Sequence, residues 1–483
     1  MEDGKINIIK DSFHQNLLLA AVSLGLVMDA LDGSIVNVAL PTMAADFCTD
    51  TGTIAWVIIT YLLMMAGFIL VFGRIADGGY MKKIFIAGII LFTAGSAACG
   101  LSFSLSLLLA SRILQGFGAA MIAAVAPLLC VRCLPPRMIG MAFGVLAATS
   151  SVGFAAGPAI GGFLTHFLSW HWIFLINIPV GIFGIFFAKK ALPDDILSLK
   201  KTPFDYLGAF FLFAAMVFAV LALQEATVPG MPASLIHASV ALFLIFILAF
   251  AVRELKTEFP LINIRIFMRW QFTSVLAAFF LINIIFMGVI YLLPFYLSLE
   301  MSFDAALSGL YLLIPPLVTC IISIPFGKLS DKYGRRWFVA AACVLMILFN
   351  AIFAIINQES GIILLITGLC LLGCVFGIAG GAASGRIVDT APKGEEAAGS
   401  SLIIMAIYLG GVIGTALYAA LFTFATSSNG LVFISELSGD MFLYGFEITM
   451  SAGAFASFIP LILSLIVREE KNFKKSDLNS GKT

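Results

Sequence analysis

The stretch VMDALDGSIVNVALP, residues 27–41, places two carboxylates, Asp29 and Asp32, inside an apolar run that begins near residue 16. A run of this length can cross the hydrocarbon core of a bilayer as a helix. The acids share nearly one helix face and, at ~1.5 Å per residue, lie about 12 Å or more from the outer end of that helix. A carboxylate at this depth costs several kcal/mol unless it faces a polar cavity or binds a proton. The stretch therefore predicts a transmembrane helix with an ionisable functional site, and the alternative is a buried structural hydrogen bond.

The rest of the chain is also strongly apolar. Of its 483 residues, 61% are hydrophobic and 11% are charged, whereas about 25% of residues are charged in an ordinary soluble protein. This composition excludes large soluble domains and predicts an all-α polytopic membrane protein. Lys and Arg together number 27, as do Asp and Glu, so no net basic charge favours nucleic acid.

Apolar runs between charged breaks predict fourteen transmembrane helices. The predicted helices span residues 16–40, 53–73, 83–102, 106–130, 138–165, 172–189, 206–225, 236–252, 271–299, 305–327, 337–356, 361–385, 397–425 and 441–467. When the loops are assigned to alternate sides, every basic residue except Arg112 falls on the side that holds both termini. The positive-inside rule therefore predicts a multi-pass protein of the cell (cytoplasmic) membrane with both termini in the cytoplasm.

A repeat relates the two ends of the chain. Pro41 and Pro294 are 253 residues apart, and Gly116 and Gly373 are 257 apart, so the first six predicted helices resemble the last six. Two six-helix halves in the same orientation are typical of secondary transporters, which bind substrate near mid-membrane between the halves. We predict an N-terminal six-helix bundle, a linker with two inserted transmembrane helices, a C-terminal six-helix bundle and a cytoplasmic tail, at residues 1–190, 191–270, 271–467 and 468–483.

Three membrane-embedded motifs follow one another in the first half. Residues 31–41 read Leu-Asp-x-Ser-x-Val-Asn-x-Ala-Leu-Pro, and Arg112 and Gln115 lie in the helix at 106–130. The helix at 138–165 carries small residues around a proline, at Gly144, Gly153, Gly157, Pro158, Gly161 and Gly162. Small residues allow helices to approach closely and a proline bends a helix, so this third motif predicts a role in gating.

Two loops on the basic side repeat a further pattern. Gly73 and Asp77 follow the second predicted helix, and Gly327, Asp331 and Arg335 follow the tenth. Acids at helix ends beside positive charge predict pairing or capping at a cytoplasmic gate. The alternative is that these acids are simply solvated loop charges.

In this order, from about residue 24 to about residue 425, the motifs resemble those of the 14-helix drug:proton antiporters of the major facilitator superfamily. That family has Thr where this chain has Ser34, and the first gate loop departs from the family pattern at Gly78, Tyr80 and Met81. The resemblance implies a major facilitator superfamily fold of two six-helix bundles plus two inserted helices. It also implies multidrug efflux, with Arg112 linked to proton coupling and the helix at 138–165 linked to export.

The acids and the arginine can form one site. Burial and mutual repulsion favour protonation of one of Asp29 and Asp32, so this pair can change charge during a transport cycle. Arg112 lies about 9 Å inside its helix at ~1.5 Å per residue, a depth close to that of Asp32, and Gln115 shares its face. We expect a pairing across the bundle; the alternative is an Arg112 side chain that extends outward along its own helix. Glu447, about 9 Å from the outer end of the last helix, is a further candidate for the coupling or substrate site, and a cavity mouth and the membrane interface fit its depth equally well.

Other chemistry is not indicated. The eight cysteines lie mostly inside apolar runs, which argues against a disulfide framework, and we expect no metal and no cofactor. His166 and His171 flank Trp170 and Trp172, a pattern typical of an interfacial aromatic belt. No phosphate-binding glycine loop or catalytic constellation occurs, so we expect neither an enzyme nor a use of ATP. The expected partners are a small lipophilic substrate, protons and membrane lipids, with no nucleic acid and a monomeric chain.

These observations predict a secondary exporter that moves lipophilic, often cationic compounds outward in exchange for protons. Proton and substrate are expected to compete for the acidic pair. Export of an endogenous metabolite or lipid is the alternative, because site chemistry and not fold decides the substrate. A membrane receptor or sensor that binds without transport fits less well, because both gate loops are present.

Overall fold

The computed structural model describes residues 8–9, 11–195, 204–226, 231–258, 260–357, 360–392, 396–426, 433 and 437–467. These residues form helices joined by short loops, with no strand among them. The predicted tail at 468–483 and part of the predicted linker lie outside the described residues. The elements are α1 (Ser12–Asp46), α2 (Thr51–Ile54), α3 (Trp56–Ile75), η1 (Ala76–Tyr80), α4 (Met81–Gly100), α5 (Leu105–Cys133), α6 (Pro136–Phe167), α7 (Trp172–Leu175), α8 (Asn177–Ala191), α9 (Tyr206–Glu225), α10 (Ala233–Lys256), η2 (Ile264–Met268), α11 (Trp270–Phe295), η3 (Tyr296–Glu300), α12 (Ala305–Leu312), α13 (Ile314–Tyr333), α14 (Arg335–Ile355), α15 (Gly361–Thr390), α16 (Glu396–Thr426), α17 (Gly439–Ala456) and α18 (Phe458–Ile466).

Thirteen described helical segments are long and apolar enough to cross a membrane. One of them, Thr51–Gly100, has 50 residues, or about 75 Å of helix, more than twice the thickness of the hydrocarbon core. It folds back at η1, where Gly79 has a φ of 104°, a conformation that glycine adopts without strain. Its arms α3 and α4 are therefore two crossings, which confirms the prediction of fourteen transmembrane helices. Gly334, with a φ of 101°, makes a similar turn between α13 and α14.

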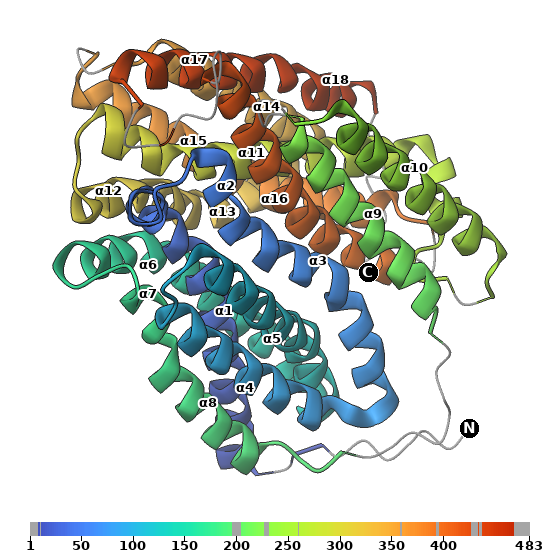
Figure 1. The fold of residues 1–483 in the computed structure, drawn as a ribbon. Coiled ribbons are helices and arrows are strands. Elements are labelled where there is room, and N and C mark those ends of the chain that lie inside the picture. Colours follow the sequence, from blue (N-terminus) through green and yellow to red (C-terminus); the bar gives the residue numbers. More distant parts are fainter. Residues whose placement is uncertain are drawn as a thin grey trace, which may run out of the picture.

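The helices gather into two halves. In the N-terminal half, α1 to α8, the closest neighbours are α1 with α6 and α4 with α5. In the C-terminal half, α11 to α18, they are α11 with α16 and α13 with α15. Figure 1 shows the N-terminal half in blue and teal below the C-terminal half in yellow to red. Pro41 and Pro294 lie at corresponding places inside α1 and α11, as the repeat spacing leads one to expect.

The two ends of the bundle differ in charge. We call one end the basic face, because its loops and helix ends carry lysine and arginine; they include Lys82, Arg132, Lys189 and Arg335. We call the other end the opposite face. The helices run between these two faces, so residues within one helix can be ordered by their distance from either face.

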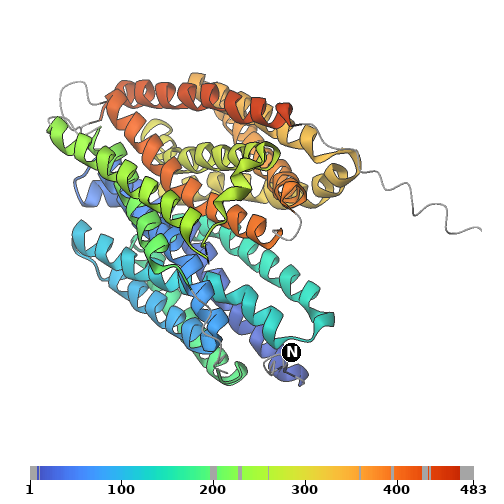
Figure 2. The ribbon, with the colours of Figure 1, turned by 90° about the vertical axis from the view of Figure 1, so that its right-hand side faces the viewer.

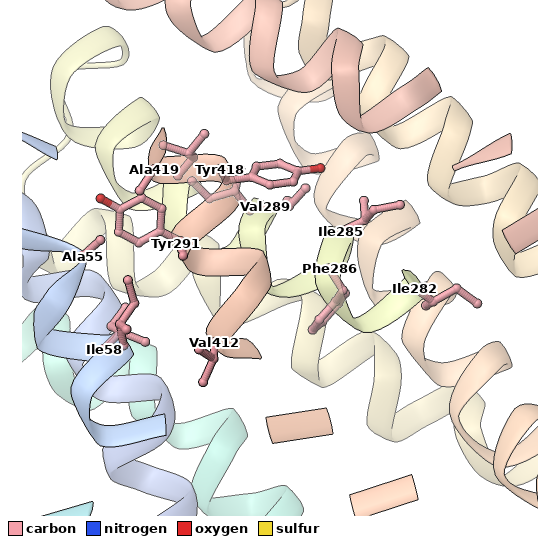
Figure 3. Packing of buried hydrophobic residues seen from close by; sticks show 14 of the residues in the cluster. Ala55, Ile58, Ile282, Ile285, Phe286, Val289, Tyr291, Val412, Tyr418 and Ala419 are labelled. Atoms are coloured by element: carbon pink, nitrogen blue, oxygen red, sulfur yellow. The ribbon is translucent and has the colours of Figure 1, made fainter. Parts of the chain in front are cut away.

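The two halves are in contact toward the opposite face. The Tyr291 hydroxyl of α11 donates to the carbonyl of Thr51, and the Thr51 and Thr423 hydroxyls are 3.5 Å apart. Figure 3 shows Ile58 of α3 facing Val412 of α16 beside these groups. Buried apolar side chains from both halves therefore form one continuous core at this level.

The inserted helices α9 and α10 form a hairpin on the outside of the two halves, shown in green in Figures 1 and 2. α9 contacts both α3 and α16. The Phe213 ring occupies the space that a Cβ at Gly67 would need, and its centroid is 5.1 Å from that of Phe68. Gln224 Nε2 donates to the Ala416 carbonyl at 3.3 Å. The hairpin thus covers the seam between α3 and α16, with one anchor in each half.

Two polar contacts hold α10 against α9. Arg253 Nε lies 2.8 Å from Asp205 Oδ2 near the basic face, and the Ser239 hydroxyl donates to Glu225 Oε2 at 2.6 Å toward the opposite face. α10 itself buries few residues. Its apolar outer side is therefore suited to contact with lipid.

We predict that Phe213→Ala lowers the stability of the fold by about 3 kcal/mol, because the ring leaves a cavity beside Gly67. Phe210→Ala is the matched control, since Phe210 lies on the same helix with 55% of its surface exposed. The measurement is thermal unfolding of the purified protein in detergent. Equal losses in the two variants would contradict an anchoring role for Phe213.

Candidate functional site

The centre of the site is the Asp32 carboxylate of α1, which is fully buried. Arg112 Nη1 of α5 lies 2.5 Å from Asp32 Oδ2, and Gln115 Nε2 donates to Asp32 Oδ1 at 2.7 Å. Both carboxylate oxygens therefore have a partner. A buried ion pair persists only when its remaining hydrogen-bonding groups are also satisfied, so these three residues form one unit.

The Arg112 side chain is fixed on every side. Its Nε donates to the Val57 carbonyl of α3 at 2.9 Å, and its Nη1 also donates to Gln115 Oε1 at 2.6 Å. The Tyr61 ring lies 4.2 Å from the guanidinium carbon, a distance typical of a cation–π contact. Gln115 Nε2 in turn donates to the Ser96 hydroxyl of α4 at 2.9 Å. Four helices, α1, α3, α4 and α5, thus meet at one charge pair.

Asp29 is half-buried and one helical turn from Asp32. The Tyr61 hydroxyl donates to Asp29 Oδ1 at 2.7 Å. Because the Tyr61 ring also lies over Arg112, Tyr61 connects the two acids through one side chain. Tyr61 lies within the predicted helix at 53–73, but no spacing in the sequence indicates its contact with Asp29.

The charged site has no counterpart in the C-terminal half. Shifted by the repeat spacing of 253, Asp32 falls on Ile285; shifted by 257, Arg112 and Gln115 fall on Leu369 and Leu372. All three of these residues are buried and apolar. The repeat therefore preserves the fold of this region and not its chemistry.

A cavity of ≈ 800 Å³ opens between the halves at the basic face. It reaches from α3 and α5 in the N-terminal half to α16, and the segments next to the inserted hairpin close one side. Its lining is mostly apolar, with charged groups toward the face; it includes Ile69, Gly73, Arg74, Asp77, Ala124, Phe204, Glu258, Leu261, Ser401 and Ile404. The cavity is large enough for a drug-sized molecule.

Neither acid lines this cavity. The expected direct competition of substrate and proton for Asp29 and Asp32 therefore does not match this conformation, in which the halves meet toward the opposite face and Asp32 is enclosed by Arg112 and Gln115. The acids lie deeper than the described inner end of the cavity. A link between cavity and acids must run through other side chains.

The small residues of α6 serve two different neighbours. A Cβ at Gly157 or Gly161 would collide with α1, at Ser34 and Ile35 respectively, and a Cβ at Gly153 would lie in tight contact with Ala30, at 3.1 Å. A Cβ at Gly162 would collide with the Ala305 carbonyl of α12, and the Pro158 carbonyl lies against Gly309 of α12. Gly144 has open space around it. The motif thus packs α6 on its own half and, near the opposite face, on the other half.

The two gate loops differ in their pairing. Arg335 Nη2 lies 2.8 Å from Asp331 Oδ1, and Arg335 Nη1 lies 2.5 Å from Asp389 Oδ2. Asp77 has a longer contact, 3.9 Å, with Arg132 Nη2 of α5. Gly73 lines the cavity, and Gly327 has open space around it. Sequence reasoning missed Asp389 and Arg132, because both lie on helices that are distant along the chain.

Other basic-face contacts reinforce the first loop. Lys82 Nζ lies 2.8 Å from Asp194 Oδ1, and the backbone N–H of Lys82 donates to Asp195 Oδ1 at 2.7 Å. The Lys82 ammonium holds the pKa of the Asp194 carboxyl below its usual value, because it donates a hydrogen bond to the ionised form. These contacts tie the start of α4 to the chain that follows α8.

Glu447 does not contact the other coupling candidates in this conformation, and its assignment to the coupling site stays a prediction. Its side chain lies on an exposed side of α17, and no ion pair or hydrogen bond joins it to the acids within the described residues. The neighbouring Phe446 and Met450 face the buried core instead. Rise along the helix gives the depth of Glu447, whereas its direction around the helix axis decides its surroundings.

No group of three or more His, Cys, Asp or Glu side chains in the described part of the chain could hold a metal ion. His171 stacks on Trp170 with ring centroids 3.7 Å apart, and Trp170 Nε1 donates to Asp46 Oδ2 at 2.6 Å. His166 Nδ1 is 3.8 Å from Asp304 Oδ2 of α12. Each histidine therefore has a different neighbour: His171 contacts an aromatic ring and His166 contacts an acid.

Two helical halves that meet toward one face, enclose a cavity at the other and hold a buried charge pair define a membrane transporter of the two-bundle type. The chain belongs to the Major Facilitator Superfamily, whose family model matches residues 22–415. This membership confirms the predicted fold and the predicted family. It also identifies the chain as a transporter and not an enzyme.

Individual relatives agree with this assignment. The chain is 30% identical over 413 residues to the riboflavin transporter RibZ of Clostridioides difficile strain 630, covering 86% of this chain and 89% of the relative. It is 29% identical over 413 residues to the multidrug resistance protein B homolog of Mycobacterium tuberculosis strain H37Rv, covering 84% and 76%. Among solved structures, a bacterial homolog of the human lysosomal transporter Spinster has a TM-score of 0.68 at 16% identity, covering 95% of this chain and 100% of that one.

We predict that Gly162→Ala separates α6 from α12 near the opposite face and lowers transport strongly, because the new methyl group meets the Ala305 carbonyl. Gly144→Ala should have little effect, since nothing lies near that position. Spin labels at the exposed positions 103 and 440, one in each half, report the separation as an inter-label distance in a background without reactive cysteines. An unchanged distance in Gly162→Ala would contradict the role given to this contact.

Proposed function

We propose that this transporter exports lipophilic, often cationic compounds in exchange for protons. The observation that carries the proposal is the buried Asp32–Arg112–Gln115 unit, with Asp29 one turn away, in one half of a repeated fold. An ionisable group fully buried in a membrane protein is costly and is typical of ion or proton pathways. The relatives named for multidrug resistance support the same activity.

Protonation of Asp32 has a direct structural consequence. It removes the negative partner of Arg112, which would then keep only neutral acceptors at Val57 and Gln115. An uncompensated buried charge costs several kcal/mol, so the protonated state favours a rearrangement of the four helices that meet there. Each proton that moves down a membrane potential supplies about 2.3 kcal/mol per 100 mV, which is sufficient to bias such a change.

We propose that the basic face is cytoplasmic and that both termini lie in the cytoplasm of the cell membrane. The supporting observation is that every basic residue outside α5 falls at this end of the predicted topology. The ≈ 800 Å³ cavity then opens to the cytoplasm, where an exporter collects its substrate. Every residue of the proposed coupling site belongs to a single chain, so we propose that the monomer is the working unit.

A second candidate substrate is a flat aromatic metabolite. The observation that favours it is the 30% identity to a protein named as a riboflavin transporter. The same apolar cavity, with Arg74 and Ser401 in its lining, suits a planar molecule with polar substituents. Proton coupling is compatible with either substrate. The proposed coupling residues, Asp29 and Asp32, do not line the cavity in which the substrate would bind.

We predict that Asp32→Asn abolishes proton release driven by tetraphenylphosphonium in sealed proteoliposomes, because the amide cannot exchange a proton. Glu447→Gln is the control for loss of an acid and should keep the release, since this exposed carboxyl has no hydrogen bond or ion pair with the described site residues. The measurement is a pH-sensitive dye inside the vesicles. Proton release that persists in Asp32→Asn would refute the role of Asp32, and saturable binding without any release in the unaltered protein would favour a sensor.

We predict that tetraphenylphosphonium and riboflavin compete for uptake into inside-out vesicles that contain the protein. Competition follows if both occupy the one large cavity at the basic face. Accumulation of each radiolabelled compound is measured with and without an imposed pH gradient. Gradient-dependent uptake of riboflavin alone would replace the drug-export proposal with the metabolite alternative.

A further inference from the structure

Tyr408 lies on the side of α16 that faces the N-terminal half. One turn toward the basic face, Ile404 lines the cavity. One turn in the other direction, Gly411 packs against Leu62 of α3, and a Cβ at Gly411 would lie 3.0 Å from Leu62 Cδ1. Residues three or four apart share a helix face. Tyr408 therefore stands beyond the inner end of the cavity, where α16 meets α3.

Tyr408 also packs against the N-terminal half. It packs against the apolar cluster of that half, which contains Tyr61. Within that cluster Tyr61 contacts Asp29 directly, and the Tyr408 hydroxyl also interacts electrostatically with this acid. Tyr61 donates to Asp29 from α3. Asp29 thus lies near two tyrosines, one from each half.

The other ionisable groups near Asp29 all belong to the N-terminal half. Asp32 is the acid that interacts with Asp29, and it lies one turn away on the same helix, α1. Tyr61 comes from α3 and Arg112 from α5, with the guanidinium over the Tyr61 ring. Among the described groups that interact with Asp29, Tyr408 is the one that belongs to the C-terminal half.

We propose that Tyr408 is a positioning residue of the proton-coupling site: its hydroxyl donates to ionised Asp29 and links the charge of the N-terminal half to the position of the C-terminal half. This inference rests on the proposed function. It adds the contact through which the charge of Asp29 affects the position of the C-terminal half. It also accounts for a cavity that reaches neither acid.

The direction of coupling follows from hydrogen bonding. An ionised carboxylate is a stronger acceptor than a protonated one, so ionised Asp29 holds α16 near α1 and protonation loosens this contact. A molecule that enters the cavity beside Ile404 meets Tyr408 before it meets either acid. Substrate and proton therefore act on one tyrosine from its two sides, without sharing a carboxylate.

The test compares Tyr408→Phe with Tyr418→Phe. Tyr418 lies on the same helix, and its buried hydroxyl has no hydrogen-bond partner, so its loss controls for removal of a hydroxyl from α16. Both variants keep the ring and its packing. In Tyr408→Phe, ionised Asp29 loses a donor, and we expect the acid limb of tetraphenylphosphonium-driven proton release to move to higher pH by about one unit. Tyr418→Phe should leave the pH profile unchanged.

Transport with an unchanged pH profile in Tyr408→Phe would overturn the proposal, and so would an equal shift in Tyr418→Phe. If the unaltered protein releases no protons, the proposed function fails, and infrared spectroscopy then tests Tyr408 separately. The band of protonated Asp29 is identified by its loss in Asp29→Asn. A change of this band in Tyr408→Phe but not in Tyr418→Phe supports the contact, and an unchanged band refutes it.

Discussion

A carboxylate and a guanidinium buried together inside a membrane protein constrain everything around them. The Asp32–Arg112 pair, at 2.5 Å and with at most 1% of either side chain exposed, cannot be stabilised by Coulomb attraction alone, because both ions have lost their hydration. The remaining donors and acceptors must find partners in the protein, and α1, α3, α4 and α5 supply them through Gln115, Val57, Ser96 and the Tyr61 ring. The packing of these four helices is therefore fixed by one electrostatic requirement. A change in the charge of Asp32 necessarily alters the same packing.

The sequence allowed much of this arrangement to be predicted. The depth of Asp32 and Arg112 follows from helix rise, and the small residues of α6 follow from their spacing. Contacts that depend on direction around a helix axis were less predictable. The surroundings of Glu447 could not be predicted, because α17 is apolar on most sides and its sequence pattern does not select one buried face. The contacts of Tyr61 with Asp29 and of Asp389 with Arg335 join residues 32 and 54 positions apart, a relation that no local spacing contains.

The two seams between the halves are closed by different physical means. At α6 and α12, glycines allow backbone to approach backbone, with the Gly162 and Gly309 positions leaving no space for a side chain. At α3 and α16, the inserted helix α9 covers the junction with the Phe213 ring and the Gln224 amide. The contact between α6 and α12 therefore depends on small residues at a few positions. The cover over α3 and α16 depends instead on the shape of large side chains on α9. The two halves are related by a repeat, yet the two seams between them are closed in different ways.

The apolar residues Ile285, Leu369 and Leu372 mark where the second repeat has lost, or never held, the ionisable residues of the first. The C-terminal half can therefore accept substitutions independently of the charged site in the N-terminal half. Substitutions can reshape the C-terminal wall of the cavity without touching the buried Asp32–Arg112 pair. Sequence variation in one repeat is then compatible with the fold, because the buried charge pair that holds four helices together lies entirely in the other repeat.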